Sequence, residues 1–487
     1  MDYGLKGTAM DGFFKDVKYG VRMLISSPVL SLIAIVAFSL GIGLTTTVFS
    51  IVNGAMYKGL PFEDADQIVS IWRTNPERDI DRGGISLHDY VDYRDQQTSL
   101  ESFGLWNQGA VNLVGGDGEP ERYAGAMVTA NMFDILRVAP VTGRGFLPGE
   151  DEPGADPVMI IGYEVWQEKF DGSEDVVGMT VRTNGEQRTI VGVAPEGFKF
   201  PMEADMWAPM EIDPLEYERG EGPQLPGFGR LREGVSLDRA SADLATIGLR
   251  LESQYPEANE GFAPLVEPFT KFVIGDELFG VLMAKLGAAI GVLLIACANV
   301  ANLLFARAAG REKEVAVRSA MGARRRRIIR QLLIEVGVLS LAGAAVGMCI
   351  GIAGIAWFNR GVATNPPPFW MSFDLDARVM GFVILITALS AVAAGLFPAI
   401  RATGRGMNEA LKDEGRGSSG LRMGRITSII VIGEVAVSCG LLIAAGLMIK
   451  SVAQLRTVDL PFAVESIFTA RLNLPATDYP ESNDRTD

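Results

Sequence analysis

Five long apolar runs interrupt an otherwise polar sequence. They cover residues 29–53, 278–306, 332–358, 378–400 and 426–449. A helix needs about 20 mostly apolar residues to cross the roughly 30 Å hydrocarbon core of a bilayer. One such run is compatible with a buried helix of a soluble protein, but five in one chain predict an α-helical polytopic membrane protein.

The first run is a retained membrane anchor rather than a signal peptide. It is longer than the apolar core of a signal peptide, which is about 7–15 residues, and no small-residue cleavage site follows it. We therefore expect residues 1–28 to form an amphipathic segment that precedes the first span.

Basic residues mark the cytoplasmic side of each span. Lys and Arg gather before the first run and in two connecting segments, 307–331 and 401–425. Because short cytoplasmic loops carry the excess of Lys and Arg, the N-terminus and these segments are expected inside. Residues 54–277 and the short loop 359–377 then lie outside a bacterial inner membrane.

The charge distribution agrees with this division. Residues 54–277 hold 41 acidic and 18 basic side chains, a net charge of −23, and the remainder holds 18 acidic and 26 basic ones, or +8. An acidic ectodomain on a basic, apolar base argues against nucleic-acid binding. Three cysteines and one histidine exclude a disulfide scaffold and a multi-histidine metal site.

The ectodomain mixes strand and helix signals. Strands are expected at 67–72 and 157–161, and Asn184-Gly185 predicts a hairpin turn within 180–193. Ser86 is placed to cap a helix, and residues 236–255 have helical periodicity that ends at Pro256. These signals predict an α+β domain, with Gly115–Gly118 as a turn.

No arrangement in the ectodomain predicts catalysis. His88 has no Ser or Cys partner, so a structural role is favoured over a functional one, and the many acid pairs follow from the charge alone. We expect no catalytic residue, no cofactor and no metal site. The chain is accordingly not expected to be an enzyme.

The chain also repeats itself at an offset of 400 residues. Arg22-Met23 corresponds to Arg422-Met423, the first apolar run to the fifth, and Leu60-Pro61-Phe62 to Leu460-Pro461-Phe462. This period fits a duplicated module rather than a solenoid. Residues 450–487 are then expected to begin a second ectodomain, and the chain to be truncated within that module.

The segment between the second and third spans has an ordered pattern. Glu314 and Arg318 are spaced four apart in the favourable order, Val315 and Met321 add an apolar strip, and Gly322 is placed to end the helix. A basic loop touching anionic lipid is the simpler interpretation, but it does not explain the pattern from Arg311 to Ala323.

This segment resembles the signature loop of the MacB/FtsX-type permeases of ABC transporter systems. Asp16–Leu24, Leu40-Gly41-Ile42-Gly43 and Phe397–Ala402 are similar to the same family, and the ectodomain resembles a MacB-like periplasmic core domain. The resemblance implies a cytoplasmic helix that docks on an ATPase, formed by Arg311, Glu312, Glu314, Val315, Arg318, Met321, Gly322 and Arg324. It implies a second cytoplasmic contact at Pro398, Arg401, Glu409 and Leu411.

The resemblance also implies partners. No Gly-x-x-x-x-Gly-Lys-Ser/Thr motif occurs, so a separate cytoplasmic ABC ATPase is expected to supply the motor. Other expected partners are the phospholipid membrane and either a second copy of the chain or a second permease module. A periplasmic adaptor is a further candidate. An envelope-sensing receptor remains the alternative function.

Polar residues within the spans are the remaining candidates. Asn299, Asn302 and Glu434 lie in predicted spans, where ionisable groups are costly and often functional. Interhelical hydrogen bonding is the simpler role for the two asparagines. Gly343, Gly347 and Gly351 recur at four-residue spacing, which predicts close helix packing in the third span.

Overall fold

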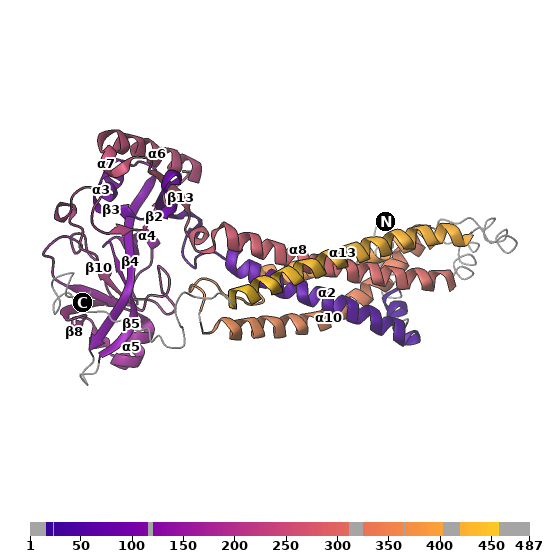
Figure 1. The fold of residues 1–487 in the computed structure, drawn as a ribbon. Helices are drawn as coiled ribbons and strands as arrows, with labels where there is room; N and C mark the ends of the chain where they lie inside the picture. The colour runs from indigo at the N-terminus through magenta and orange to yellow at the C-terminus, as the bar shows by residue number, and fades with distance from the viewer. Residues whose placement is uncertain are drawn as a thin grey trace, which may run out of the picture. The chain divides into compact units, whose positions relative to one another are not determined.

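The computed structural model describes residues 16–22, 24–114, 120–310, 325–364, 366–402 and 419–456 (Figure 1). These residues form two compact units. The helical unit takes its residues from Met1–Tyr57, Asp276–Pro366 and Phe373–Ser466, and the ectodomain from Lys58–Gly275 and Pro367–Ser372. The predicted hairpin turn at 115–118 lies outside the described residues.

Five helices of the helical unit are long and apolar enough to cross a membrane, which confirms the predicted fold class. They are α2 (Pro28–Val52), α8 (Phe269–Gly310), α10 (Arg325–Val362), α11 (Ala377–Ala402) and α13 (Ser419–Arg456). Half of the apolar window of the first helix is buried, whereas none of the window of the fifth is. Helix α2 is therefore central in the packing of this unit.

Two glycines let the backbone of α2 approach two neighbours. A Cβ at Gly41 would lie 2.9 Å from the Leu293 side chain of α8, and one at Gly43 would lie 2.8 Å from the Gly347 carbonyl oxygen of α10. The hydroxyl of Thr45 also donates to the Ala289 carbonyl oxygen of α8 at 3.1 Å. Positions two apart on a helix face nearly opposite ways, so this short motif serves both contacts.

The glycines of α10 form the other side of the same contact. A Cβ at Gly343 would lie 2.5 Å from Cβ of Phe38, and one at Gly347 would lie 2.9 Å from the Ser39 carbonyl oxygen. Gly351 faces Thr46 at 3.3 Å. The four-residue spacing thus predicted the packing face correctly, because small residues allow membrane helices to touch through their backbones.

The ectodomain is built on a mixed, eleven-stranded sheet. Its order is β13-β1-β12-β4-β5-β10-β7-β9-β6, with β2 beside β1 and β8 beside β4 and β9. The strands are β1 (Ile68–Asn75), β2 (Ile80–Gly83), β4 (Leu100–Val114), β5 (Pro120–Val128), β6 (Thr142–Gly143), β7 (Val158–Ile161), β8 (Thr180–Thr183), β9 (Glu186–Val193), β10 (Met206–Pro209), β12 (Gly227–Leu231) and β13 (Ala263–Pro268). A separate pair joins β3 (Ile85–Ser86) to β11 (Gln224–Leu225).

Strand β4 links the two ends of the ectodomain. It pairs with β12 through its first residues and with β5 through Trp106–Val114. The helices α3 (Leu87–Gln96), α6 (Leu237–Gln254) and α7 (Pro256–Asn259) gather at one end of this strand, and α5 (Tyr163–Phe170) lies at the other (Figure 1). The short helix α4 (Met132–Leu136) packs into the core beside β4 and β12.

Local sequence signals in the ectodomain are confirmed. Helix α6 begins after Ser236, whose hydroxyl accepts from the Arg239 amide at 3.3 Å, and it buries Ala240, Leu244, Ile247 and Leu251. Ser86 caps α3 by accepting from the Asp89 amide at 3.2 Å. Asn184 and Gly185 have φ angles of 50° and 91° between β8 and β9, as the predicted hairpin requires.

We predict that Gly347→Leu destabilises the helical unit. The new side chain meets backbone atoms of α2 rather than mobile side chains, and overpacking of this kind costs about 1–3 kcal/mol. Gly337→Leu is the matched control on α10, because a Cβ at that glycine meets no atom within 4 Å. Thermal unfolding followed by circular dichroism should show a lower midpoint for Gly347→Leu alone. Equal midpoints for the two variants would contradict the assigned contact.

Candidate functional site at the cytoplasmic helix ends

Arginines tie together the helix ends that are predicted to face the cytoplasm. Arg307 at the end of α8 donates to the Ser27 hydroxyl at 2.8 Å. Arg325 at the start of α10 donates to the Ile400 carbonyl oxygen of α11 at 3.2 Å. These two arginines lie on either side of the segment 311–324, which is outside the described residues, and each contacts a neighbouring element.

The N-terminal segment joins the same cluster of helix ends. Residues 16–22 are helical, and Asp16 forms an ion pair with Arg330 of α10 at 3.1 Å. A Cβ at Gly20 would lie 3.2 Å from the Val338 side chain, so this segment packs on α10. Arg330 is half exposed, and such pairs contribute at most about 1 kcal/mol. The pair therefore positions the segment more than it stabilises it.

A small cavity of about 40 Å³ lies between α8, α10 and α11 near these contacts. Pro398 lines it, together with Glu335 and Arg307. A proline inside a helix removes one backbone hydrogen bond and weakens the helix locally. Pro398 thus faces the neighbouring helices, and Arg401 follows it, half buried, in the last turn of α11.

The predicted docking residues lie outside the described residues. These are Arg311, Glu312, Glu314, Val315, Arg318, Met321, Gly322 and Arg324, and of the second contact Glu409 and Leu411. The structure describes the helices on both sides of each segment. The docking assignment therefore stays a prediction.

The intramembrane polar residues occupy different environments. Asn299 is exposed on α8, and Glu434 is half buried on α13. Oδ1 of Asn302 is buried and finds no hydrogen-bond partner among the residues that the structure describes. The interhelical hydrogen bond expected for Asn302 is thus not seen at this atom.

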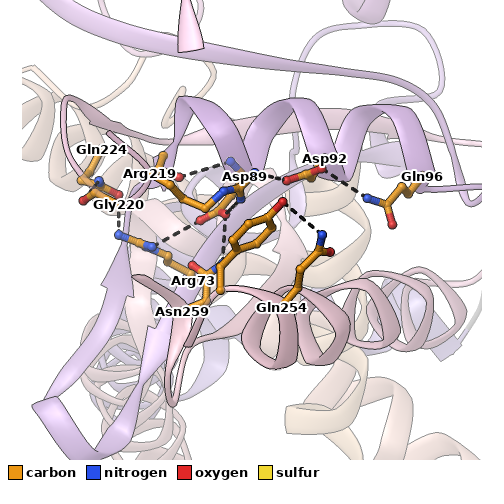
Figure 2. A network of polar contacts seen from close by, with 11 residues as sticks. Arg73, Asp89, Asp92, Gln96, Arg219, Gly220, Gln224, Gln254 and Asn259 are labelled. Carbon is orange, nitrogen blue, oxygen red and sulfur yellow. Dashed lines mark hydrogen bonds and ion pairs between the residues drawn. The ribbon is translucent and has the colours of Figure 1, made fainter. Parts of the chain in front are cut away.

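A buried network of charged side chains in the ectodomain is centred on Asp89 (Figure 2). The Asp89 carboxylate accepts from Arg219 at 3.0 Å and from the Asn259 amide of α7 at 3.1 Å. Arg73 of β1 lies 3.5 Å away on the other carboxylate oxygen. Burial lowers the pKa of Arg73, and the nearby Asp89 carboxylate acts in the opposite direction.

Further contacts complete this network. Arg219 also donates to Asp92 at 2.6 Å and stacks over the Tyr255 ring at 3.8 Å. Arg73 stacks over the Phe262 ring at 4.2 Å and donates to Gln224. Two cations face two anions, and the members come from β1, α3, α7 and the loop before β11. These contacts hold α3, α7 and β1 together, which is a structural role. His88 lies half buried on the same helix α3.

Comparison with known proteins matches two families. The MacB-like periplasmic core domain family matches residues 31–247, and the FtsX-like permease C-terminal family matches residues 286–407. The first match covers most of α2 and the ectodomain from β1 into α6, and the second covers α10, α11 and most of α8. The chain is a MacB/FtsX-type ABC permease. The permease is accordingly a multi-pass membrane protein with a periplasmic or extracellular domain.

Relatives of this permease include both fused and single-function proteins. It is 27% identical to the pyoverdine export ATP-binding/permease protein PvdT of Pseudomonas syringae, over 61% of this chain and 43% of that protein. It is 25% identical to the uncharacterized ABC transporter permease YknZ of Bacillus subtilis, over 56% of this chain and 66% of that protein. The chain thus spans less than half of PvdT and about two thirds of YknZ.

Solved structures also align with part of this chain. The periplasmic region of MacB from Actinobacillus actinomycetemcomitans aligns with a TM-score of 0.32 and 16% identity, covering 41% of this chain and 89% of that one. The families matched in this permease are both permease families, whereas PvdT is named as an ATP-binding protein as well.

Sequence reasoning did not identify the partners among these helix-end contacts. The ion pair between Arg330 and Asp16 joins residues that are more than 300 positions apart. Many acids and arginines share this region, so composition does not select the pair. The only available signal was the position of Asp16 in a helical segment directly before the first span.

We predict that Asp89→Ala destabilises the ectodomain strongly. Removing the buried carboxylate leaves Arg73 and Arg219 facing each other without compensation, which costs about 3–5 kcal/mol. Asp95→Ala is the control, because its ion pair with Arg94 is about half exposed and contributes at most about 1 kcal/mol. If the two variants lost the same free energy of unfolding, the Asp89 network would contribute no more than an exposed ion pair.

Denaturant unfolding of the intact chain measures this difference through tryptophan fluorescence. Five of the six tryptophans (Trp72, Trp106, Trp166, Trp207 and Trp370) belong to the ectodomain, so the signal reports mainly on that unit.

Proposed function

We propose that this permease couples ATP hydrolysis by a separate cytoplasmic ATPase to movement of its periplasmic domain, in an export or mechanotransmission system. In this function the N-terminus is cytoplasmic, and the segment 311–324 docks on the ATPase.

The contacts at the cytoplasmic helix ends carry the proposal. Helix α8 ends at Gly310 and α10 begins at Arg325, so a short segment connects the two. Arg307 and Arg325 fix the flanking helices to Ser27 and to the end of α11. A push on residues 311–324 would therefore reach α8, α10, α11 and the N-terminal segment together.

The relatives support the partner. PvdT is named as both an ATP-binding and a permease protein, which joins the two functions in one chain. The family matches of this chain cover the permease functions alone. A separate ATPase, recruited through the segment 311–324, supplies the missing function in this proposal.

The internal repeat extends the proposal to the fifth helix. Helix α13 occupies the repeat position of α2, and both are helical as the offset of 400 residues predicts. The apolar window of α13 has no buried residue, whereas half of the apolar window of α2 is buried. In this proposal α13 is the counterpart of α2 in a second permease module. Residues 457–487 lie outside the described residues.

A capture experiment tests the ATPase partner. The tagged intact chain is isolated in mild detergent from membranes of its native host, and co-purified ATPases are identified by mass spectrometry. We expect an ABC ATPase with the intact chain and about tenfold less with Glu314→Ala/Arg318→Ala. Truncating charges within an interface costs roughly 2 kcal/mol or more, and 1.4 kcal/mol corresponds to tenfold.

The control is Asp238→Ala/Arg239→Ala, which removes one acid and one base from an exposed part of α6 in the ectodomain. It should capture as much ATPase as the intact chain. Equal recovery with the 314/318 variant would remove the segment 311–324 as the docking site. Recovery of no ATPase by a folded chain would overturn the proposal and favour the sensing function.

A further inference from the structure

The loop between α10 and α11 belongs to both units. Helix α10 ends at Val362 and α11 begins at Ala377, and the six residues Pro367–Ser372 between them are part of the ectodomain. Within the described residues, the chain therefore passes between the two units at three places: after Tyr57, before Asp276, and through this loop. We call Pro367–Ser372 the anchor segment.

Trp370 is the buried residue of the anchor segment. It is 3% exposed and belongs to the ectodomain core that also contains Phe200 and Phe228. Its ring packs edge-on against Phe269 with centroids 5.8 Å apart, and Phe269 is itself 1% exposed. Burial of an aromatic ring of this size is among the larger contributions that one side chain makes to a core.

The neighbours of Trp370 strengthen this attachment. The Phe369 ring lies 5.9 Å from that of Phe62, and its amide donates to the Met202 carbonyl oxygen at 3.5 Å. Lys58 donates to the Ser372 hydroxyl. Lys58 and Phe62 are among the first residues of the ectodomain, and Phe269 is near its last. The anchor segment thus packs where the chain enters and leaves this domain.

The rest of the loop is bound to the helical unit. The Phe373 carbonyl oxygen accepts from Asn359 of α10 at 3.1 Å, and the Asp374 carbonyl oxygen accepts from Ser50 of α2 at 2.8 Å. The Asp376 carboxylate accepts from the Asn53 amide at 2.7 Å. Little free chain separates these contacts from Ser372, so the loop has little slack.

The other two connections are locally irregular. A π-helical turn, Asn53–Tyr57, follows α2. On the other side, Gly275 interrupts α8 with φ 62° and ψ 165°, and a Cβ there meets no atom within 4 Å. When domains move, the hinge is commonly formed by a few residues at the ends of helices or strands, which absorb the change in φ and ψ. A body held at two points can still turn about the line that joins them.

From these contacts we propose that the anchor segment is a third mechanical attachment, with Trp370 as the positioning residue that holds α10 and α11 to the ectodomain core. It restricts rotation of the ectodomain and passes displacement of α10 and α11 to it. This role rests on the proposed coupling function, and it assigns the loop a task within it.

Three variants separate the attachment role of Trp370 from its contribution to core stability. Trp370→Ala removes the anchor, and Trp370→Phe keeps an aromatic ring in its place. Insertion of Gly-Ser-Gly-Ser between Ser372 and Phe373 leaves every anchoring contact in place but adds slack to the loop. If Trp370 served only to stabilise the ectodomain core, the insertion would leave the distance between the two units unchanged.

The measurement is the distance between spin labels on Asp238→Cys in α6 and Arg360→Cys in α10, both exposed. The intact chain is used in lipid nanodiscs, with Cys297, Cys349 and Cys439 replaced by alanine. We expect a single narrow distance distribution for the otherwise unchanged chain and for Trp370→Phe. It should become broad for Trp370→Ala and for the insertion, while thermal unfolding of the insertion variant stays unchanged.

An unchanged distribution in both the insertion and the Trp370→Ala variants would overturn the third attachment. This test needs no ATPase, so it fails or succeeds independently of the capture experiment. If an ATPase is captured, ATP should shift the distance in the intact complex and shift it less in the insertion variant. A broadened distribution without any captured ATPase would keep the attachment and remove the coupling function.

Discussion

The backbone contact between α2 and α10 is the constraint on which the rest of the helical unit depends. Gly43 and Gly347 approach so closely that neither tolerates a Cβ without displacing a backbone atom. In a bilayer no hydrophobic effect drives helices together, so close van der Waals packing has to do so. Because α2 leads into the ectodomain and α10 leads into the anchor segment, this helix pair is continuous with the ectodomain at two places in the chain.

Features set by local sequence were predictable, and those set by distant partners were not. The apolar runs, the glycine spacing of α10, the Asn184-Gly185 turn and the face of α6 each depend on residues within a few positions of one another. The Asp89 network depends on Arg219 and Asn259, which lie 130 and 170 residues away. In so acidic a domain the sequence offers many possible partners, and the fold selects among them.

The anchor segment shows the same limit from another direction. A short loop between two spans is expected to be polar and exposed. The adjacent aromatic residues Phe369 and Trp370 depart from this expectation, and no prediction was based on them. Two adjacent aromatic residues in such a loop have to be buried somewhere, but the loop sequence does not name the core that receives them. For the segment 311–324 the opposite holds. Its sequence pattern predicts a docking helix, but these residues lie outside those that the structure describes.

Transmission of force through such a chain requires stiff bodies joined by compliant links. The α2–α10 contact stiffens the helical unit, while β4 runs through both ends of the ectodomain sheet and the Asp89 network fastens α3, α7 and β1. Backbone irregularities occur at Gly275 and in the π-helical turn after α2, where the chain passes from one unit to the other. In the coupling function proposed above, a displacement of the helical unit would be taken up at these two places, and the anchor segment would limit the directions in which the ectodomain turns.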